Sequence, residues 1–157
     1  MGFEDQVAKP GDYFVSRMGE ESVILTRDRQ GKLHVFLNSC RHRGMKVCRY
    51  DAGNTPVFTC PYHGWSYGLG GELVGVPHFK EAYHSELKKE EWGLAEVAQM
   101  RNYKGTIWAT WDPKAPSFEE YVGDNLLGLG LFLDKKDGSE ADIEMLGVMK
   151  WTFPANW

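Results

Sequence analysis

Cys40-Arg41-His42 and Cys60-Pro61-Tyr62-His63 are the two stretches that decide how this chain folds. Seventeen residues separate His42 from Cys60, and each stretch offers one thiolate and one imidazole. Two cysteines and two histidines in this arrangement can hold a two-iron, two-sulfide cluster whose irons have unlike ligands. We expect Cys40 and Cys60 to bind one iron, and His42 and His63 to bind the other. The sequence therefore predicts an electron carrier.

A single zinc ion is the main alternative ligand for these four side chains, because two cysteines and two histidines form a common tetrahedral zinc set. A typical zinc finger has both cysteines in one knuckle and both histidines in the next. Here each knuckle mixes the two residue types, and the first has the tight form Cys-x-His. The pattern favours the cluster, while a zinc site, or four polar residues with no common ligand, stays open as an alternative.

The bulk composition is that of one ordinary globular domain. The 157 residues include 42% hydrophobic and 25% charged side chains, and the net charge is −4. No basic stripe suits nucleic acid, no apolar run is long enough to span a membrane, and no signal peptide is visible at the N-terminus. Three cysteines are few for a secreted chain, so we expect a reducing, cytoplasmic compartment and an inert buried thiol at Cys48.

Short runs of β-branched and aromatic residues, separated by turn residues, predict an all-β fold. Hairpin loops are expected at 27–32, where Gly31 can take a positive φ, and at 101–105. The polar segment 79–91 can form one or two helical turns, and a capping box of Ser117 and Glu120 predicts a short helix over about 118–123. The expected strands cover residues 22–26, 33–37, 57–59, 65–67, 72–76, 94–100, 106–111 and 145–153.

The two knuckles resemble the cluster motif of the Rieske domain in the large (alpha) subunits of aromatic-ring-hydroxylating dioxygenases. This resemblance implies a Rieske iron–sulfur fold of stacked antiparallel sheets, with a small cluster-binding subdomain at about 38–78. Rieske proteins of respiratory complexes carry an extra disulfide, where this chain has Met45 and Tyr62. The matching segments are Cys40-Arg41-His42-Arg43-Gly44, Cys60-Pro61-Tyr62-His63-Gly64-Trp65, Pro10-Gly11-Asp12-Tyr13, Phe36-Leu37-Asn38, Gly53-Asn54, Gly70-Gly71-Glu72-Leu73 and Val76-Pro77.

The resemblance also implies a division of the chain and a set of partners. Residues 1–116 would form the Rieske domain, and 117–157 an extension that leads to an absent catalytic domain. Electrons would arrive from a ferredoxin or reductase and leave towards a mononuclear iron in the catalytic domain of a neighbouring alpha subunit, within a trimer that can include beta subunits. The remaining histidines, His34, His78 and His84, do not fit the iron-binding pattern of that domain, so we expect no catalysis by this chain alone. A free-standing Rieske-type ferredoxin is the alternative function, and a zinc-binding structural module is a further one.

Residues around the two knuckles carry secondary expectations. Gly44 and Gly64 would let backbone N–H groups approach the sulfur atoms. Two hairpin loops would meet at a tip, with the imidazoles outermost. Trp65 and Tyr67 either shield the cluster or are plain core residues, and Arg41 and Arg43 either steer an acidic donor or are merely solvated.

Overall fold

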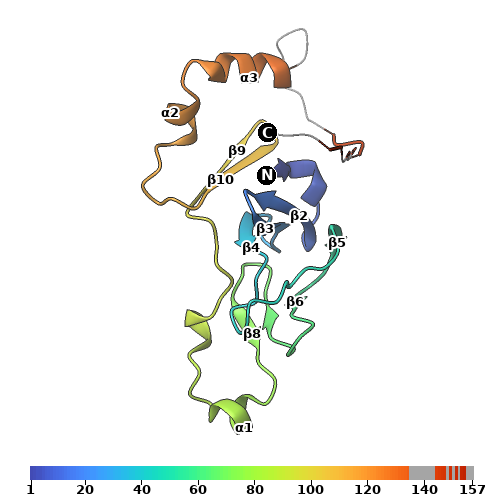
Figure 1. Ribbon diagram of the computed structural model, residues 1–157, viewed down its shortest axis with the longest axis vertical. Coiled ribbons are helices and arrows are strands. Elements are labelled where there is room, and N and C mark those ends of the chain that lie inside the picture. The colour runs from blue at the N-terminus through green and yellow to red at the C-terminus, as the bar shows by residue number, and fades with distance from the viewer. Residues whose placement is uncertain (135–143, 148, 150, 152, 155–157) are drawn as a thin grey trace.

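The computed structural model describes residues 1–134, 144–147, 149, 151 and 153–154. In this part of the chain, three small antiparallel sheets follow one another along the long axis of the molecule, with helical segments at both ends (Figure 1). The strands are two to seven residues long, because turns interrupt them at short intervals. The prediction of an all-β fold built from antiparallel sheets is confirmed.

A four-stranded sheet of order β4-β3-β2-β5 forms the middle of the molecule (Figure 1). The aliphatic run Val23–Leu25 is buried in its centre, since such side chains pack well on a pleated surface. The hairpin loop expected between β3 and β4 is present, and Gly31 takes a φ of +85° in it. Its strands are β2 (Asp12–Met18), β3 (Glu21–Arg27), β4 (Leu33–Leu37) and β5 (Ala52–Asn54).

A second sheet of order β1-β10-β9 packs against the first through a shared core. It consists of β1 (Gly2–Phe3), β9 (Gln99–Tyr103) and β10 (Thr106–Thr110). The 3-10 helix η1 (Glu4–Val7) connects β1 to the four-stranded sheet and buries Val7 completely. The shared core consists of Val7, Val23, Leu25, Leu33, Val35, Val97 and Ile107.

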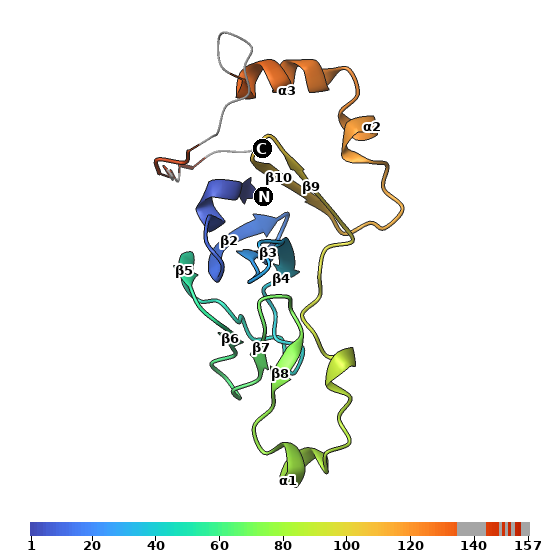
Figure 2. The same ribbon diagram turned by 180° about the vertical axis from the view of Figure 1, so that it is seen from behind.

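The third sheet, of order β6-β7-β8, lies on the other side of the four-stranded sheet (Figure 2). It consists of β6 (Phe58–Thr59), β7 (Ser66–Tyr67) and β8 (Leu73–Gly75). The β7–β8 turn rests against β4, where Gly71 takes a φ of +87°. A Cβ atom at Gly71 would lie 2.5 Å from Cε1 of Phe36, so only glycine fits this approach.

Helices occupy the segments next to the outer sheets. α1 (Phe79–Tyr83) and the 3-10 helix η2 (Lys89–Glu91) lie where the polar segment 79–91 predicts helical turns. α2 (Phe118–Val122) begins at the predicted capping box, in which the Glu120 N–H donates to Ser117 Oγ and the Ser117 N–H donates to Glu120 Oε2. A further helix, α3 (Asn125–Leu133), has no counterpart in the sequence prediction. No helix within the described residues is long and apolar enough to cross a membrane.

Two strand predictions are wrong. The sequence predicts a strand over 94–100 and a loop over 101–105, whereas β9 covers Gln99–Tyr103 and the turn is at 104–105. Residues 94–98 instead lie beside the free edge of β4. There the Leu37 N–H donates to the carbonyl of Ala95 and the Val97 N–H to that of Val35, which gives one isolated bridge between Glu96 and Phe36. The predicted strand over 145–153 is absent from the residues of that segment that the structure describes, and residues 148, 150 and 152 lie outside them.

At neutral pH the side chain of Glu4 connects η1 to β3 and β9 by hydrogen bonds. Its carboxylate accepts hydrogen bonds from Arg27 of β3 and Asn102 of β9, and the Arg27 Nη2–Glu4 Oε1 distance is 2.8 Å. These two hydrogen bonds, with that of Arg27 the larger effect, hold the pKa of Glu4 below its usual value. The stabilisation is therefore present above the pKa of the unfolded chain, and it is lost as the pH falls through the lower pKa of the folded chain.

We predict that Glu4→Gln lowers the free energy of unfolding by about 1 kcal/mol at pH 7, a modest value because the side chain is partly exposed. The difference from the wild type should shrink as the pH falls below about 4, where the wild-type carboxylate also loses its charge. Urea denaturation of both proteins at pH 7 and pH 3 measures this. An equal difference at both pH values would contradict the assignment.

Candidate metal centre

The two sequence knuckles fold into loops with the same backbone hydrogen bonds. In the first loop the Cys40 N–H donates to the carbonyl of Met45 (2.8 Å), and the Gly44 N–H donates to the carbonyl of Cys40 (2.8 Å). In the second, the Cys60 N–H donates to the carbonyl of Trp65 (2.8 Å), and the Gly64 N–H donates to that of Cys60 (3.0 Å). Each loop is thus closed by hydrogen bonds at the same two positions relative to its cysteine. Each loop contributes one thiol and one imidazole to the site.

Glycine is required at the end of each turn. Gly44 and Gly64 both have a φ of +74°, a left-handed conformation that side chains with a Cβ atom rarely adopt. A Cβ atom at Gly64 would also lie 3.0 Å from Cγ of Pro77. The N–H groups of these glycines close the turns and do not reach sulfur. The backbone N–H groups of Tyr62 and His63 instead act on the thiol of Cys60, whose pKa they lower.

The two thiols lie side by side in the interior. Cys40 and Cys60 are each only 2% exposed, and the Cys40 thiol lies close enough to raise the pKa of the Cys60 thiol. Burial raises the pKa of Cys60, and the Cys40 thiol raises it further, while the backbone N–H groups of Tyr62 and His63 act in the opposite direction. Two buried thiols facing each other in this way are suited to binding one metal ion as thiolates.

The two imidazoles lie further out than the thiols. His42 is partly buried and His63 is exposed, and their ring centroids are 4.7 Å apart at an interplanar angle of 75°. The Nδ1 atom of His42 is buried and has no hydrogen-bond partner among the residues that the structure describes, a costly arrangement that a metal bond would relieve. Burial, followed by the charges of His63 and Arg43, lowers the pKa of His42, which favours the neutral form that binds metals.

Aromatic side chains enclose the imidazole side of the site. Trp65 is 3% exposed and stacks on His42 with a centroid distance of 4.9 Å and an interplanar angle of 13°. Tyr83 and Trp92 meet the indole edge to face, at 6.1 and 5.7 Å. Trp65 is therefore a core residue and a shield for His42 at once, so the two interpretations from the sequence do not exclude each other.

Tyr67 reaches the thiol side of the site from β7. It is completely buried, its hydroxyl lies 3.2 Å from Sγ of Cys40, and it accepts the N–H of Arg41 at 3.0 Å. Burial, and then the neighbouring Cys40, raises the pKa of Tyr67, so the hydroxyl keeps its proton. Opposite a metal-bound thiolate, which has no proton to give, this hydroxyl would be the hydrogen-bond donor.

Asn38 is a supporting residue that the sequence singles out only as part of a matching segment. Its buried side chain accepts the N–H groups of Val47 and Cys48 at 2.9 Å and donates to the Cys48 carbonyl at 2.9 Å and to Ser22 Oγ at 3.2 Å. These hydrogen bonds hold Val47 and Cys48, which follow the first loop, close to Ser22 of β3. The signal in the sequence was a polar residue directly after the predicted strand Leu33–Leu37.

Cys48 and the other histidines lie outside the site. Cys48 is buried, and desolvation raises the pKa of its thiol to about 12, which fits the inert thiol expected from the sequence. His34 is buried on β4, with Nδ1 2.8 Å from Glu96 and Nε2 3.0 Å from Asp28. His78 and His84 flank α1 at its two ends.

The donor set fits a two-metal cluster better than a single ion. The thiols form one pair and the imidazoles another, with the thiols deeper in the protein. A tetrahedral zinc site would require four donors around one point, whereas a Rieske-type cluster takes two donors at each iron.

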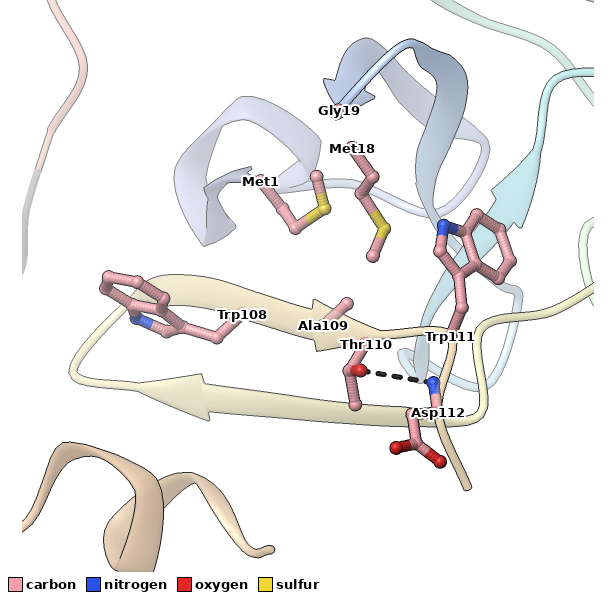
Figure 3. A pocket seen from close by; sticks show the side chains of 8 residues that line it. All are labelled: Met1, Met18, Gly19, Trp108, Ala109, Thr110, Trp111 and Asp112. Carbon is pink, nitrogen blue, oxygen red and sulfur yellow. Dashed lines mark hydrogen bonds between the residues drawn. The ribbon is translucent and has the colours of Figure 1, made fainter. Parts of the chain in front are cut away.

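An open pocket of about 580 Å³ lies elsewhere, beside the N-terminus and β10 (Figure 3). Met1 and Met18 point into this space above β10, and Trp108 and Trp111 lie at its two sides (Figure 3). Asp112 is the only ionisable side chain in its lining. Neither cysteine nor histidine is among the described residues that line it.

Comparison with known proteins agrees with the geometry. The family model of the Rieske [2Fe-2S] domain matches residues 1–103. Over the whole chain, the sequence is 46% identical to the biphenyl 2,3-dioxygenase subunit alpha of Rhodococcus jostii (strain RHA1) and 44% identical to the benzene 1,2-dioxygenase subunit alpha of Pseudomonas putida. The chain spans about a third of the length of these relatives, 33% and 34% respectively.

A solved structure gives the same result. The naphthalene 1,2-dioxygenase from Rhodococcus sp., crystallised with indole, superimposes with a TM-score of 0.82 at 45% identity. The superposition covers 85% of this chain and 30% of that one. With the matched family model, the antiparallel sheets and the paired loops, these similarities lead to one conclusion: the chain belongs to the Rieske [2Fe-2S] domain family.

Proposed function

We propose that this chain carries single electrons through a [2Fe-2S] cluster held by Cys40, Cys60, His42 and His63. The observation that carries the proposal is the convergence of two identically closed loops, each with one cysteine and one histidine. The unpartnered Nδ1 of His42 and the adjoining thiols of Cys40 and Cys60 support this choice of ligands. The separation of the donors into a thiol pair and an imidazole pair, together with the match to the Rieske family model, favours this cluster over the alternative of a zinc-binding structural module.

The protein residues set the redox properties of such a site. A bound cluster supplies the one-electron couple. Two neutral imidazoles in place of two thiolates make its net charge less negative, which favours uptake of an electron at roughly −150 to +300 mV, against about −400 mV for all-cysteine ferredoxins. The hydroxyl of Tyr67 directs a positive dipole at the sulfur of Cys40, which further favours the reduced form.

We further propose that the chain is the electron-transfer part of an aromatic-ring-hydroxylating dioxygenase alpha subunit. Its similarity to such subunits extends over its full length, including the part beyond residue 103 where the Rieske family model ends, and this favours the larger enzyme over a free-standing ferredoxin. In this proposal residues 1–116 form the Rieske domain, and 117–157 lead towards a catalytic domain. A ferredoxin or reductase supplies the electrons, in a reducing cytoplasm, and a mononuclear iron of a neighbouring alpha subunit receives them.

The ligand assignment predicts which variants lose the cluster. Cys60→Ala and His63→Ala should abolish stoichiometric binding of iron and sulfide, because each removes one of two protein ligands from an iron. The matched controls Cys48→Ala and His84→Ala should keep two irons, two sulfides and the uptake of one electron per chain. Chemical analysis of iron and acid-labile sulfide, with coulometric titration, measures all three. Loss of the cluster in both controls, or its retention in both ligand variants, would refute the assignment.

Tyr67→Phe should lower the reduction potential of the cluster. The variant removes one hydrogen bond to Cys40, worth about 1 kcal/mol in favour of the reduced form, which corresponds to roughly 40 mV for a one-electron couple. Protein-film voltammetry of the variant and the wild type gives the shift. Tyr103→Phe, which alters a tyrosine of β9 in another sheet, should leave the potential unchanged. An unchanged or higher potential in Tyr67→Phe would show that the hydroxyl does not act on the cluster.

A further inference from the structure

A buried histidine lies between two carboxylates at the edge of the four-stranded sheet. His34 of β4 is 5% exposed. Its Nε2 atom lies 3.0 Å from Oδ2 of Asp28 in the β3–β4 hairpin loop, and its Nδ1 atom lies 2.8 Å from Oε1 of Glu96. Because an ionised carboxylate can only accept hydrogen bonds, both ring nitrogens must donate for both contacts to form. Only the imidazolium form of His34 satisfies both partners.

The other close neighbours of the ring are uncharged. The ring stacks on Phe36 with a centroid distance of 5.4 Å and an interplanar angle of 11°, and its pairing neighbour on β3 is Thr26. Within the described residues, Asp28 and Glu96 are the ion-pair partners of His34. The imidazolium lies between two negative charges, whereas a neutral ring leaves both of them unopposed. The second proton on His34 therefore decides whether this group of side chains attracts or repels.

Further charged side chains lie in the hairpin loop and in the β7–β8 turn. Arg29 and Lys32 are exposed, and Glu72 lines an open pocket of about 450 Å³ together with Asp28 and Arg29. Within the part of the chain that the structure describes, none of these three side chains forms an ion pair with Asp28 or Glu96. The balance of charge between the two carboxylates is thus set by the histidine itself.

The two carboxylates are held unequally. The side chain of Asp28 is 13% exposed, and its Oδ1 atom also accepts the N–H groups of Gln30 at 2.9 Å and Lys32 at 2.8 Å. Burial acts to raise the pKa of Asp28, but the hydrogen bonds from His34, Lys32 and Gln30 outweigh it and lower that pKa. The side chain of Glu96 is 47% exposed. Since a neutral ring donates from one nitrogen only, we expect it to keep the fixed Asp28 and to release Glu96, which water can solvate.

Glu96 belongs to a segment that is sparsely attached to the sheet. Two backbone hydrogen bonds and one isolated bridge join residues 94–98 to the edge of β4, whereas β2, β3 and β4 pair in regular ladders. Trp92, two residues before this segment, packs edge to face on Trp65, which in turn covers His42. The contact of Glu96 with the histidine therefore helps to hold a stretch of chain that leads directly to the aromatic side chains around the site.

From this arrangement we propose that His34, Asp28 and Glu96 form a pH-sensitive switch. With two protons on its ring, His34 holds segment 94–98 against β4. When the pH rises and Nδ1 loses its proton, the contact with Glu96 breaks, and the segment loosens together with the neighbouring Trp92. The stabilisation is thus present while the ring is charged and is lost as the pH rises, at pH values where both carboxylates stay ionised. The switch does not depend on which group the two cysteine–histidine loops bind, so it can fail while the proposed function holds.

Hydrogen–deuterium exchange of the purified, cluster-loaded chain tests the switch without a variant. Exchange is followed by mass spectrometry from about pH 5.5 to about pH 8.5, on both sides of the ordinary pKa of a histidine. Each rate is divided by the intrinsic rate of an unprotected amide at the same pH. Protection of residues 92–98 should fall by roughly tenfold across this range, because one hydrogen bond to a charged group is lost. Protection of β2 and β3 should stay constant. Constant protection of 92–98, or an equal fall in β2 and β3, would overturn the proposal.

The variant Glu96→Gln separates the charge of this contact from its hydrogen bond. A glutamine amide can accept from a protonated Nδ1 and can donate to an unprotonated one, so the contact no longer requires the imidazolium. Protection of residues 92–98 in this variant should not fall as the pH rises. The matched control Glu86→Gln changes an exposed glutamate outside the switch and should keep the pH dependence of the wild type. A pH dependence of wild-type size in Glu96→Gln would assign the effect to another group and contradict the switch.

Nuclear magnetic resonance of the oxidised chain labelled with 15N-histidine observes the proton directly. The signals of His34 are identified by their loss in His34→Gln. Both ring nitrogens should carry a proton at the low end of the pH range, and Nδ1 should lose its proton as the pH rises, over the same range in which the protection of residues 92–98 falls. A ring that stays neutral, stays doubly protonated or loses the Nε2 proton instead would overturn the proposal.

Discussion

The hydrogen bonds that close the two loops are the constraint on which the site depends. In both loops the cysteine N–H reaches the carbonyl five residues later, and a glycine N–H returns to the cysteine carbonyl. This turn can form only because Gly44 and Gly64 adopt a positive φ. It directs both thiols inwards and both imidazoles outwards, and it therefore separates the four donors into two unlike pairs without any long-range ordering of the chain.

The surroundings make this local geometry rigid. Asn38 satisfies three backbone groups of the returning first loop, and the fully buried Tyr67 joins that loop to β7 through Cys40 and Arg41. Trp65 covers His42 from the core side. Buried polar groups are costly unless they are paired, so such a network favours one arrangement of the loops over many. The two imidazoles lie on the outer side of the site, and that of His63 is exposed, so a partner can approach there.

The sequence predicts the site better than it predicts the whole fold, for physical reasons. The knuckles, the capping box at Ser117 and the β3–β4 hairpin depend on local chemistry that a few residues specify. The segment 94–98 has a strand-like composition but lies along the edge of β4 and pairs irregularly, which only the tertiary structure decides. β2 was missed because Ser16 and Arg17 interrupt its apolar pattern. The roles of Asn38 and Tyr67 depend on contacts with residues far along the chain, which spacing alone does not reveal.

The central claim is that sulfur ligands hold one iron and nitrogen ligands hold the other. Pulsed electron paramagnetic resonance of the dithionite-reduced chain, isotopically labelled with 15N-histidine, tests it most directly. The account predicts a spin-half signal coupled to two histidine nitrogens, from a sample with two irons and two sulfides per chain. A signal without histidine coupling, or a protein that binds one metal ion and no sulfide, would contradict it.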